Sequence, residues 1–281
     1  MNSHKSTGPQ YERFTRLNRG LHIFTILSFI TLSLTGMTLK FSYTGWAVAL
    51  SRFFGGFEAA GFYHRLAAFV MIMVFLIHLV DLARLKTKSG MGFKKMLLNP
   101  NSMWFNKKDW RELKASLKWF LGRGERPAYG RWTYWEKFDY LAVFWGMVVI
   151  GSTGMTLWFP ELFTLFLPGW VLNVATIVHS DEALLATGFI FTVHFFNTHL
   201  RPEKFPMDIV IFSGRVPLEE FKLDRPEEYA KLVESGELEK HLVEPYQPIV
   251  IRAIRVFGTV ALFTGLFIVV WILYAMIFAY R

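Results

Sequence analysis

The stretch Leu141–Leu157, LAVFWGMVVIGSTGMTL, carries no charged residue on any face of a helix. A helix on the surface of a soluble protein has a polar face opposite its apolar stripe, so this pattern indicates a helix surrounded by lipid. Each of five apolar blocks is long enough to cross a bilayer core of ~30 Å, which needs about 20 helical residues. The five blocks are Leu21–Phe41, Phe62–Ala83, Phe138–Phe159, Val174–Thr198 and Ala253–Tyr280.

The distribution of charge predicts how these helices are oriented. Of the 281 residues, 31 are Lys or Arg and 22 are Asp or Glu, which gives a net charge of +9. Most basic residues lie in three polar segments, 1–20, 84–137 and 201–255. By the positive-inside rule these segments are cytoplasmic. The N-terminus is therefore expected in the cytoplasm and the C-terminus outside, and nucleic acid is not expected as a partner.

The expected fold class is an all-α integral membrane protein. Two repeated hairpins form a four-helix transmembrane bundle, and a fifth C-terminal transmembrane helix follows. The predicted segments are a cytoplasmic N-terminal arm (1–20), a first hairpin (21–85), a basic and aromatic cytoplasmic loop (86–137), a second hairpin (138–200), a cytoplasmic segment (201–250) and the fifth helix (251–281). The loop mixes Lys and Arg with Trp and Phe, as is typical of a helix lying on anionic membrane lipid.

An internal repeat relates the two hairpins. Thr35-Gly36-Met37-Thr38-Leu39 recurs as Thr153-Gly154-Met155-Thr156-Leu157, and each copy ends an odd-numbered apolar block. A short outer loop and a helix that opens with a histidine follow each copy. The small residues allow either close helix packing or the insertion of a flat cofactor between the helices.

Histidines carry the chemical signal, because the chain has no cysteine. This absence excludes disulfides, thiolate-bound iron–sulfur clusters, CxxCH haem attachment and cysteine-based zinc sites. Six histidines, which are costly in hydrocarbon, lie in or at the ends of the apolar blocks. They are His22, His64, His78, His179, His194 and His199.

Helical spacing places these histidines at two depths. His64 and His78 stand ~21 Å apart along one helix, and His179 and His194 stand ~22 Å apart along another. Bis-histidine haem needs one ligand from each of two facing helices at one depth. The levels therefore predict two haems b, with a third haem as a weaker alternative. Zinc is disfavoured because no carboxylate or thiolate joins these histidines at ligand spacing.

The inner level has more histidines than one haem needs. His22 begins the first block at roughly the depth of His78 and His194. His199 lies five residues beyond His194 and, in an α-helix, is rotated from it by ~140°. Spacing alone leaves open which of the four bind iron and which line a neighbouring quinone pocket.

A series of motifs between Arg16 and Arg201 carries a family resemblance. The motifs are Arg19-Gly20-Leu21-His22, Gly36, His64, Thr153-Gly154, Trp158-Phe159-Pro160 and His179. In this order they resemble the membrane cytochrome b subunits of respiratory formate dehydrogenases. The chain is more loosely similar to the related subunits of Ni,Fe-hydrogenases and thiosulfate reductases and to bacterial cytochromes b561.

The resemblance implies a ligand set. It assigns His64 and His179 to the outer haem, and His22 with His194 to the inner haem, with His199 as an alternative to His194. His78 is an additional histidine, and its spacing from His64 looks like the arrangement in the cytochrome b of bc complexes. The inner ligands are thus two of His22, His194 and His78. The polar segment after the fourth block and the fifth helix also lie outside the family's usual core.

The resemblance also implies a role in the inner, cytoplasmic membrane of a prokaryote. The chain would be an electron-transfer subunit, with no catalytic residues of its own, between the quinone pool and an extracytoplasmic iron–sulfur or multihaem cytochrome c partner. A quinone such as menaquinone would bind near His199 and Asn197. Asp81 and Asp139 are either proton-handling groups or ordinary helix-end carboxylates. Arg65 is either a partner of a haem propionate or an ordinary interfacial arginine.

Two other function classes compete with this interpretation. A proton-coupled transporter could use intramembrane His and Asp, but inverted repeats and broken helices would be expected, whereas the two halves here are parallel. A structural membrane-anchor subunit would not need paired histidines. A haem absorbance spectrum distinguishes both classes from a cytochrome.

Overall fold

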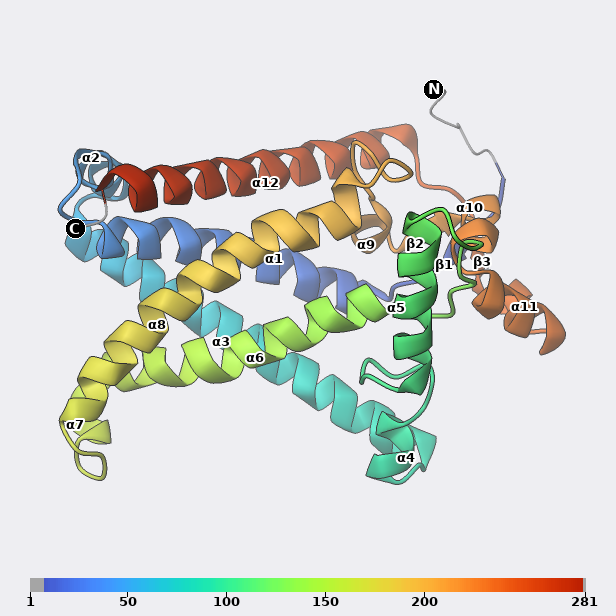
Figure 1. The fold of residues 1–281 in the computed structure, drawn as a ribbon, viewed down its shortest axis with the longest axis horizontal. Helices are drawn as coiled ribbons and strands as arrows, with labels where there is room; N and C mark the ends of the chain where they lie inside the picture. Colours follow the sequence, from blue (N-terminus) through green and yellow to red (C-terminus); the bar gives the residue numbers. More distant parts are fainter. Residues whose placement is uncertain (1–7, 280–281) are drawn as a thin grey trace. The chain divides into compact units, whose positions relative to one another are not determined.

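The computed structural model describes residues 8–279 and is mainly helical (Figure 1). Five of its helices are long and apolar enough to cross a membrane. They are α1 (Arg16–Lys40), α3 (Phe57–Ser89), α6 (Tyr134–Trp158), α8 (Trp170–Phe189, continued by η1 and η2 to Leu200) and α12 (Pro248–Tyr274, continued by η4, Ala275–Ala279). The five predicted apolar blocks are thereby confirmed as helices, each extended at one or both ends by residues outside its block.

Shorter elements fill the connections. The connection from α1 to α3 holds α2 (Gly45–Phe54), and α7 (Pro160–Phe163) follows α6. The polar segments hold α4 (Phe93–Leu97), α5 (Lys107–Phe120), α9 (Val210–Ser213), α10 (Leu218–Asp224), α11 (Pro226–Glu234) and the 3₁₀ turn η3 (Leu238–His241). Pro202 follows Arg201 directly after η2, and since proline cannot continue a helix, the long α8–η2 helix ends there.

The chain forms two compact units. The helical unit comprises Leu21–Val80, Val143–Asp208 and Arg255–Arg281, and it holds all six histidines discussed above. The polar unit comprises Met1–Gly20, Asp81–Ala142 and Ile209–Ile254.

The core of the helical unit joins three long helices. Phe191 and Phe195 of the α8–η2 helix are buried together with Met37 of α1 and with Leu262 and Ile268 of α12. Helix α2 covers the far end of α12 (Figure 1), where the rings of Trp46 and Trp271 have centroids 5.6 Å apart. The fifth helix is therefore an integral part of this unit rather than a separate appendage.

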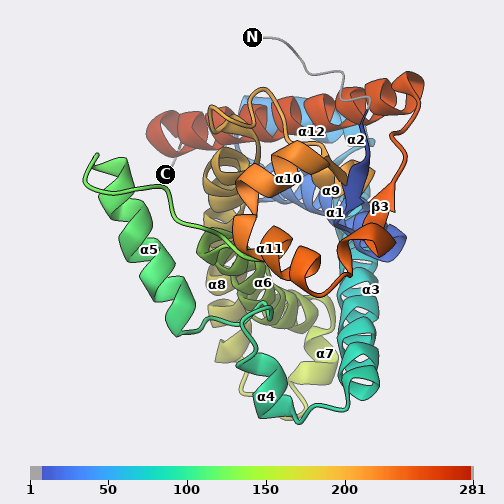
Figure 2. The same ribbon diagram turned by 90° about the vertical axis from the view of Figure 1, so that its right-hand side faces the viewer.

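The polar unit contains a small sheet that the sequence analysis does not predict. Strand β1 (Gln10–Glu12) pairs antiparallel with β2 (Arg215–Pro217) on one side and with β3 (Leu242–Val243) on the other. Figure 2 shows α10 and α11 close to this sheet. The ring of Tyr11 stacks on that of Phe221 at 4.0 Å. Strands of two or three residues are too short to show alternating polarity, so no sequence pattern signals them.

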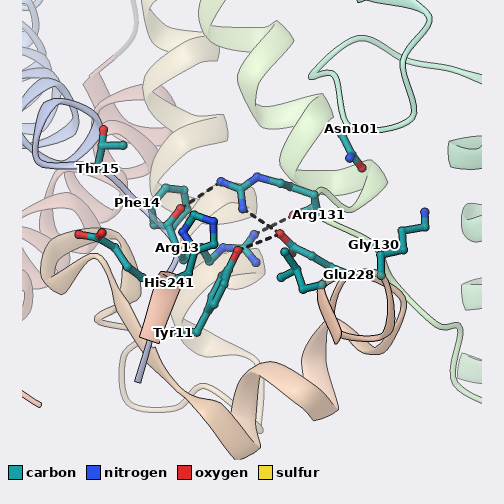
Figure 3. Close-up of a pocket in the computed structure, with 12 residues that line it drawn as sticks. Tyr11, Arg13, Phe14, Thr15, Asn101, Gly130, Arg131, Glu228 and His241 are labelled. Atoms are coloured by element: carbon teal, nitrogen blue, oxygen red, sulfur yellow. Dashed lines mark hydrogen bonds and ion pairs between the residues drawn. The ribbon is translucent and has the colours of Figure 1, made fainter. Parts of the chain in front are cut away.

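Buried arginines join the N-terminal arm to the rest of this unit. Arg13 and Arg225 both pair with the Glu136 carboxylate, at 3.1 and 2.8 Å. Burial, together with the nearby charge of Arg225, lowers the pKa of Arg13 to about 10. Arg131 pairs with Glu228 at 2.8 Å beside a cavity of about 410 Å³, which Figure 3 shows. The main charges at this cavity neutralise one another, which is consistent with a structural role.

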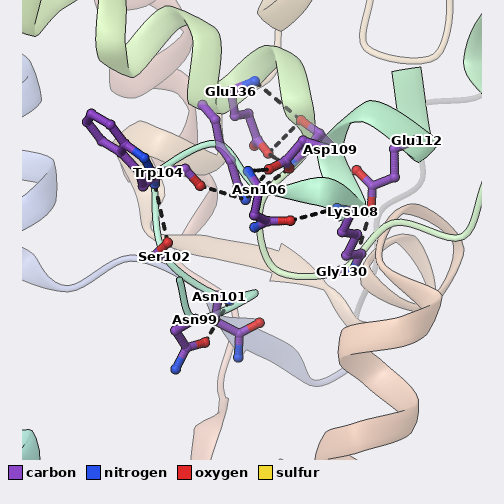
Figure 4. Close-up of polar contacts among 12 residues, drawn as sticks. Asn99, Asn101, Ser102, Trp104, Asn106, Lys108, Asp109, Glu112, Gly130 and Glu136 are labelled. Carbon is purple, nitrogen blue, oxygen red and sulfur yellow. Dashed lines mark hydrogen bonds and ion pairs between the residues drawn. The ribbon is translucent and has the colours of Figure 1, made fainter. Parts of the chain in front are cut away.

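A second polar cluster fixes α5 against the start of α6. Lys137 and Asp109 form an ion pair at 2.9 Å, and the side chain of each is only 1% exposed. Asp109 also closes a capping box with Asn106 at the N-terminus of α5 (Figure 4). This carboxylate therefore both caps the helix and neutralises a buried lysine.

Glu112, one turn along α5, gives a testable pH dependence. Burial raises its pKa to about 7, although Lys108 at 3.5 Å opposes the shift. The neutral acid is favoured in the folded state, so its stabilising contribution is fully present below about pH 4.5 and is lost as the pH rises through 7. We expect the melting temperature to fall between pH 5.5 and pH 8 in the wild type and to fall less in Glu112→Gln. An equal fall in both proteins would contradict this assignment.

Candidate functional site

His64 of α3 and His179 of α8 face each other within the helical unit. Their ring centroids are 6.2 Å apart and their planes meet at 78°. Both side chains are partly buried. The structure thus brings together the two histidines that the sequence assigns to the outer level.

Each of these rings is held by the helix that carries one copy of the repeat. The Nδ1–H of His179 donates to the Ile150 carbonyl at 3.0 Å and lies 3.3 Å from the Thr153 hydroxyl. That hydroxyl donates to the Val149 carbonyl, so it accepts from the ring. Nε2 is then the ring nitrogen that can bind a metal.

The first copy of the repeat repeats this arrangement. His64 Nδ1 lies 3.0 Å from the Thr35 hydroxyl, which itself donates to the Thr31 carbonyl. The backbone of Leu32, which occupies the position of Ile150 in the other copy, also interacts with His64. Equivalent residues of the two copies therefore orient both imidazoles, and metal-binding histidines commonly donate the proton of their other ring nitrogen to such groups.

The glycine of each copy makes room for the ring. A Cβ at Gly154 would lie 2.9 Å from His179 Cε1, and one at Gly36 would lie 3.3 Å from His64 Cε1. The first separation is too short for any unmoved contact and the second is tight. The His179 ring in its observed position therefore requires glycine at 154, and the His64 ring leaves little room for a larger residue at 36.

The spacing of the two rings fits two axial ligands of one iron. Imidazole–metal bonds of about 2 Å on opposite sides of a metal place the ring centroids roughly 6 Å apart, close to the 6.2 Å observed. Residues 8–279 contain no group of three or more His, Cys, Asp or Glu that could hold a metal ion. A cofactor that brings its own equatorial ligands and needs only two histidines, as haem does, fits this pair better than a bare ion.

Two charged residues near this pair, Asp181 and Glu182, are not among the site residues predicted from the sequence. Lys40 pairs with Asp181 at 3.0 Å and donates to Ser180 at 2.9 Å, next to His179. Glu182 accepts a 2.7 Å hydrogen bond from the indole of Trp145. The sequence signal that could have identified them is the presence of two adjacent carboxylates inside an apolar block, since intramembrane charges usually mark function. Arg65, beside His64, is exposed.

A second histidine cluster contains His22 of α1 with His194 and His199. His22 lies close enough to both partners for electrostatic interaction, and His194 and His199 interact in the same way. His199 is buried and His22 and His194 are partly buried. Three of the four histidines predicted at the inner level are therefore neighbours.

The backbone around His194 and His199 is π-helical. It runs through η1 (Ile190–His194) and η2 (Phe196–Leu200). In a π-helix the hydrogen bonds join residues five apart, so His194 and His199 come close to the same face. The ~140° rotation predicted for an α-helix is wrong for this segment. π-Helical turns occur frequently at functional sites.

The structure also gives the setting of the other predicted residues. The ring of His78 packs against that of Phe144, with centroids 5.9 Å apart. Asn197 lies in η2 and is partly buried. Asp139 is buried in α6, and Asp81 is partly buried in α3, both within the polar unit.

Helix α12 supports the π-helical segment through one glycine. A Cβ at Gly265 would lie 2.3 Å from Phe191 and 2.8 Å from Phe195. These two phenylalanines flank His194 in the chain and are buried against α12. Gly265 thus permits the close approach that fixes the backbone carrying His194 and His199.

We expect Gly265→Ala to disturb the His22–His194–His199 cluster selectively. The added methyl group must displace Phe191 or the whole of α12, which moves η1 and its histidine. If the cluster binds haem, about one of two haems per chain should be lost, as measured by pyridine haemochrome. Gly188→Ala is the matched control, because nothing lies within 4 Å of that Cβ. Loss of cofactor in the control, or none in Gly265→Ala, would contradict this prediction.

The sequence matches no protein-family model and no curated protein.

Proposed function

We propose that this protein is the dihaem b-type cytochrome subunit of a membrane oxidoreductase. It would move electrons across the membrane between the quinone pool and a redox partner outside the cytoplasm. The observation that carries the proposal is the His64–His179 pair, 6.2 Å apart and held by the two copies of the repeat through equivalent contacts. A structural anchor would not need this duplicated arrangement, so its presence favours a bound cofactor.

In this proposal the residues of the chain hold and orient the cofactor, and the cofactor supplies the redox chemistry. A haem provides a one-electron couple at its iron, tuned by its axial ligands and by their hydrogen bonds. Thr35 and Thr153 fix the orientation of the two outer rings, and the backbone carbonyl accepting from His179 increases the basicity of its Nε2. Lys40, at the end of α1, holds the middle of α8 through Asp181.

The inner haem would be held by His22 and His194. His22, His194 and His199 interact with one another, which supports His22 with His194 as the ligand pair. His199 and Asn197 would then be available to a quinone headgroup at this level. The outer connections, which contain α2 and α7, would form the docking face for an extracytoplasmic iron–sulfur or multihaem cytochrome c partner.

A haem assay on purified protein tests this proposal. We expect about two haems b per chain in the wild type, with one lost in His22→Ala and both retained in His78→Ala. Redox titration of each variant identifies which potential disappears. The reverse pattern would assign His78 to the inner site and move His22 into the quinone pocket. Absence of haem from the wild type would overturn the proposal and favour a transporter or an anchor.

A further inference from the structure

Helix α5 has its polarity reversed relative to an ordinary surface helix. Its buried side chains are Asp109, Glu112 and Ser116, each less than 7% exposed. Its outward side carries Trp110 and Leu117, which are 63% and 53% exposed. A helix covering a water-soluble unit would bury the tryptophan and leucine and expose the acids.

The polar partners of the buried face explain why it points inward. Asp109 neutralises Lys137, and the Ser116 hydroxyl is 2.8 Å from that of Tyr129. Lys108 lies between Glu112 and Glu227 of α11. These contacts fix the rotation of α5 about its axis, so the exposed apolar side chains cannot turn into the unit.

The exposed side is also strongly basic. All exposed charged residues of α5 are positively charged: Lys107, Arg111, Lys114 and Lys118. Leu121, just after the helix, is 69% exposed and continues the apolar row. Apolar side chains flanked by lysine and arginine suit the boundary between acyl chains and anionic headgroups.

The chain connectivity favours the same partner. The membrane-spanning helices α3 and α6 end at Ser89 and begin at Tyr134, so both ends of the segment that contains α5 are tethered to the membrane. Figure 2 shows α5 at the periphery of the polar unit. We propose that the outward face of α5, formed by Trp110, Leu117, Leu121 and the four basic residues, is a binding surface for anionic phospholipid at the cytoplasmic leaflet.

Nitroxide labelling tests this surface directly, because the chain has no native cysteine. Leu117→Cys and Val233→Cys would be labelled separately and reconstituted into vesicles of phosphatidylglycerol and phosphatidylethanolamine. Val233 is a matched control, because it is also apolar and about half exposed but lies on α11 among glutamates. We expect the Leu117 label to be accessible to oxygen and shielded from a water-soluble nickel chelate. The Val233 label should show the opposite pattern.

A charge variant tests the lipid specificity. Replacing Lys107, Arg111, Lys114 and Lys118 together with glutamine should increase nickel access to the Leu117 label in these vesicles. In vesicles of phosphatidylcholine alone, nickel access to the Leu117 label should also increase in the protein that keeps its four basic residues. A Leu117 label that is as accessible to nickel as Val233 would overturn the proposal. Shielding from both reagents would also overturn it, because a protein surface rather than lipid would then cover the helix.

Discussion

Gly154→Ala is expected to remove the outer haem of the proposed cytochrome. The new methyl carbon would lie 2.9 Å from His179 Cε1 and 3.3 Å from Nδ1. The ring must therefore shift from the position that Ile150 and Thr153 hold, and metal–ligand distances tolerate changes of only about 0.2 Å. Pyridine haemochrome should show a loss of about one haem per chain, with the inner haem retained.

Two other glycines supply a graded control for this experiment. Gly36→Ala should have a smaller effect, because its Cβ would lie 3.3 Å from His64. Gly151→Ala should leave both haems in place, since nothing lies within 4 Å of that Cβ. It should also stabilise α6 by about 1 kcal/mol through helix propensity. Equal haem content in all three variants would show that His64 and His179 are not the ligands.

The second large effect is expected in the polar unit. Asp109→Ala removes the only acidic partner found at Lys137 in the described part of the chain and opens the capping box of α5. Removing one partner of a buried ion pair usually costs about 3–5 kcal/mol, because the other charge stays buried without compensation. We expect a loss of this size in the free energy of unfolding, measured in detergent with a chemical denaturant.

A double mutant separates the ion pair from the cap. Lys137→Met alone should also destabilise, since it leaves the Asp109 carboxylate buried without its cation. The combined variant should recover most of the loss and retain only the cost of the cap, about 1 kcal/mol. Strict additivity of the two single effects would indicate that the carboxylate and the ammonium do not interact in solution.

The transmembrane helices and the candidate site residues were largely predictable from the sequence. Long runs without charge leave few alternatives to a membrane helix, and five such helices are present. The repeat Thr-Gly-Met-Thr-Leu predicted two equivalent settings, and these hold His64 and His179. The position of one histidine after each copy was enough to pair them, because helical rise converts spacing into depth.

Tertiary structure decided the features that depend on contacts between distant segments. The pairing of β1 with β2 joins Tyr11 to Val216, which are distant in the sequence, and strands this short have no periodicity to detect. The rotation of α5 depends on polar partners from α6 and α11, so its composition alone could not show which face is covered.

At the inner histidines, too, the sequence predicts some features and tertiary contacts decide the others. Composition and spacing predicted a histidine-rich site at this level, because unpaired imidazoles are costly in hydrocarbon. Which histidines meet there depended on the π-helical backbone around His194 and on Gly265 of α12, which lets Phe191 pack closely. A local sequence fixes helix and depth through hydrophobicity, whereas the face that a side chain presents is set by the neighbours against which the backbone must pack.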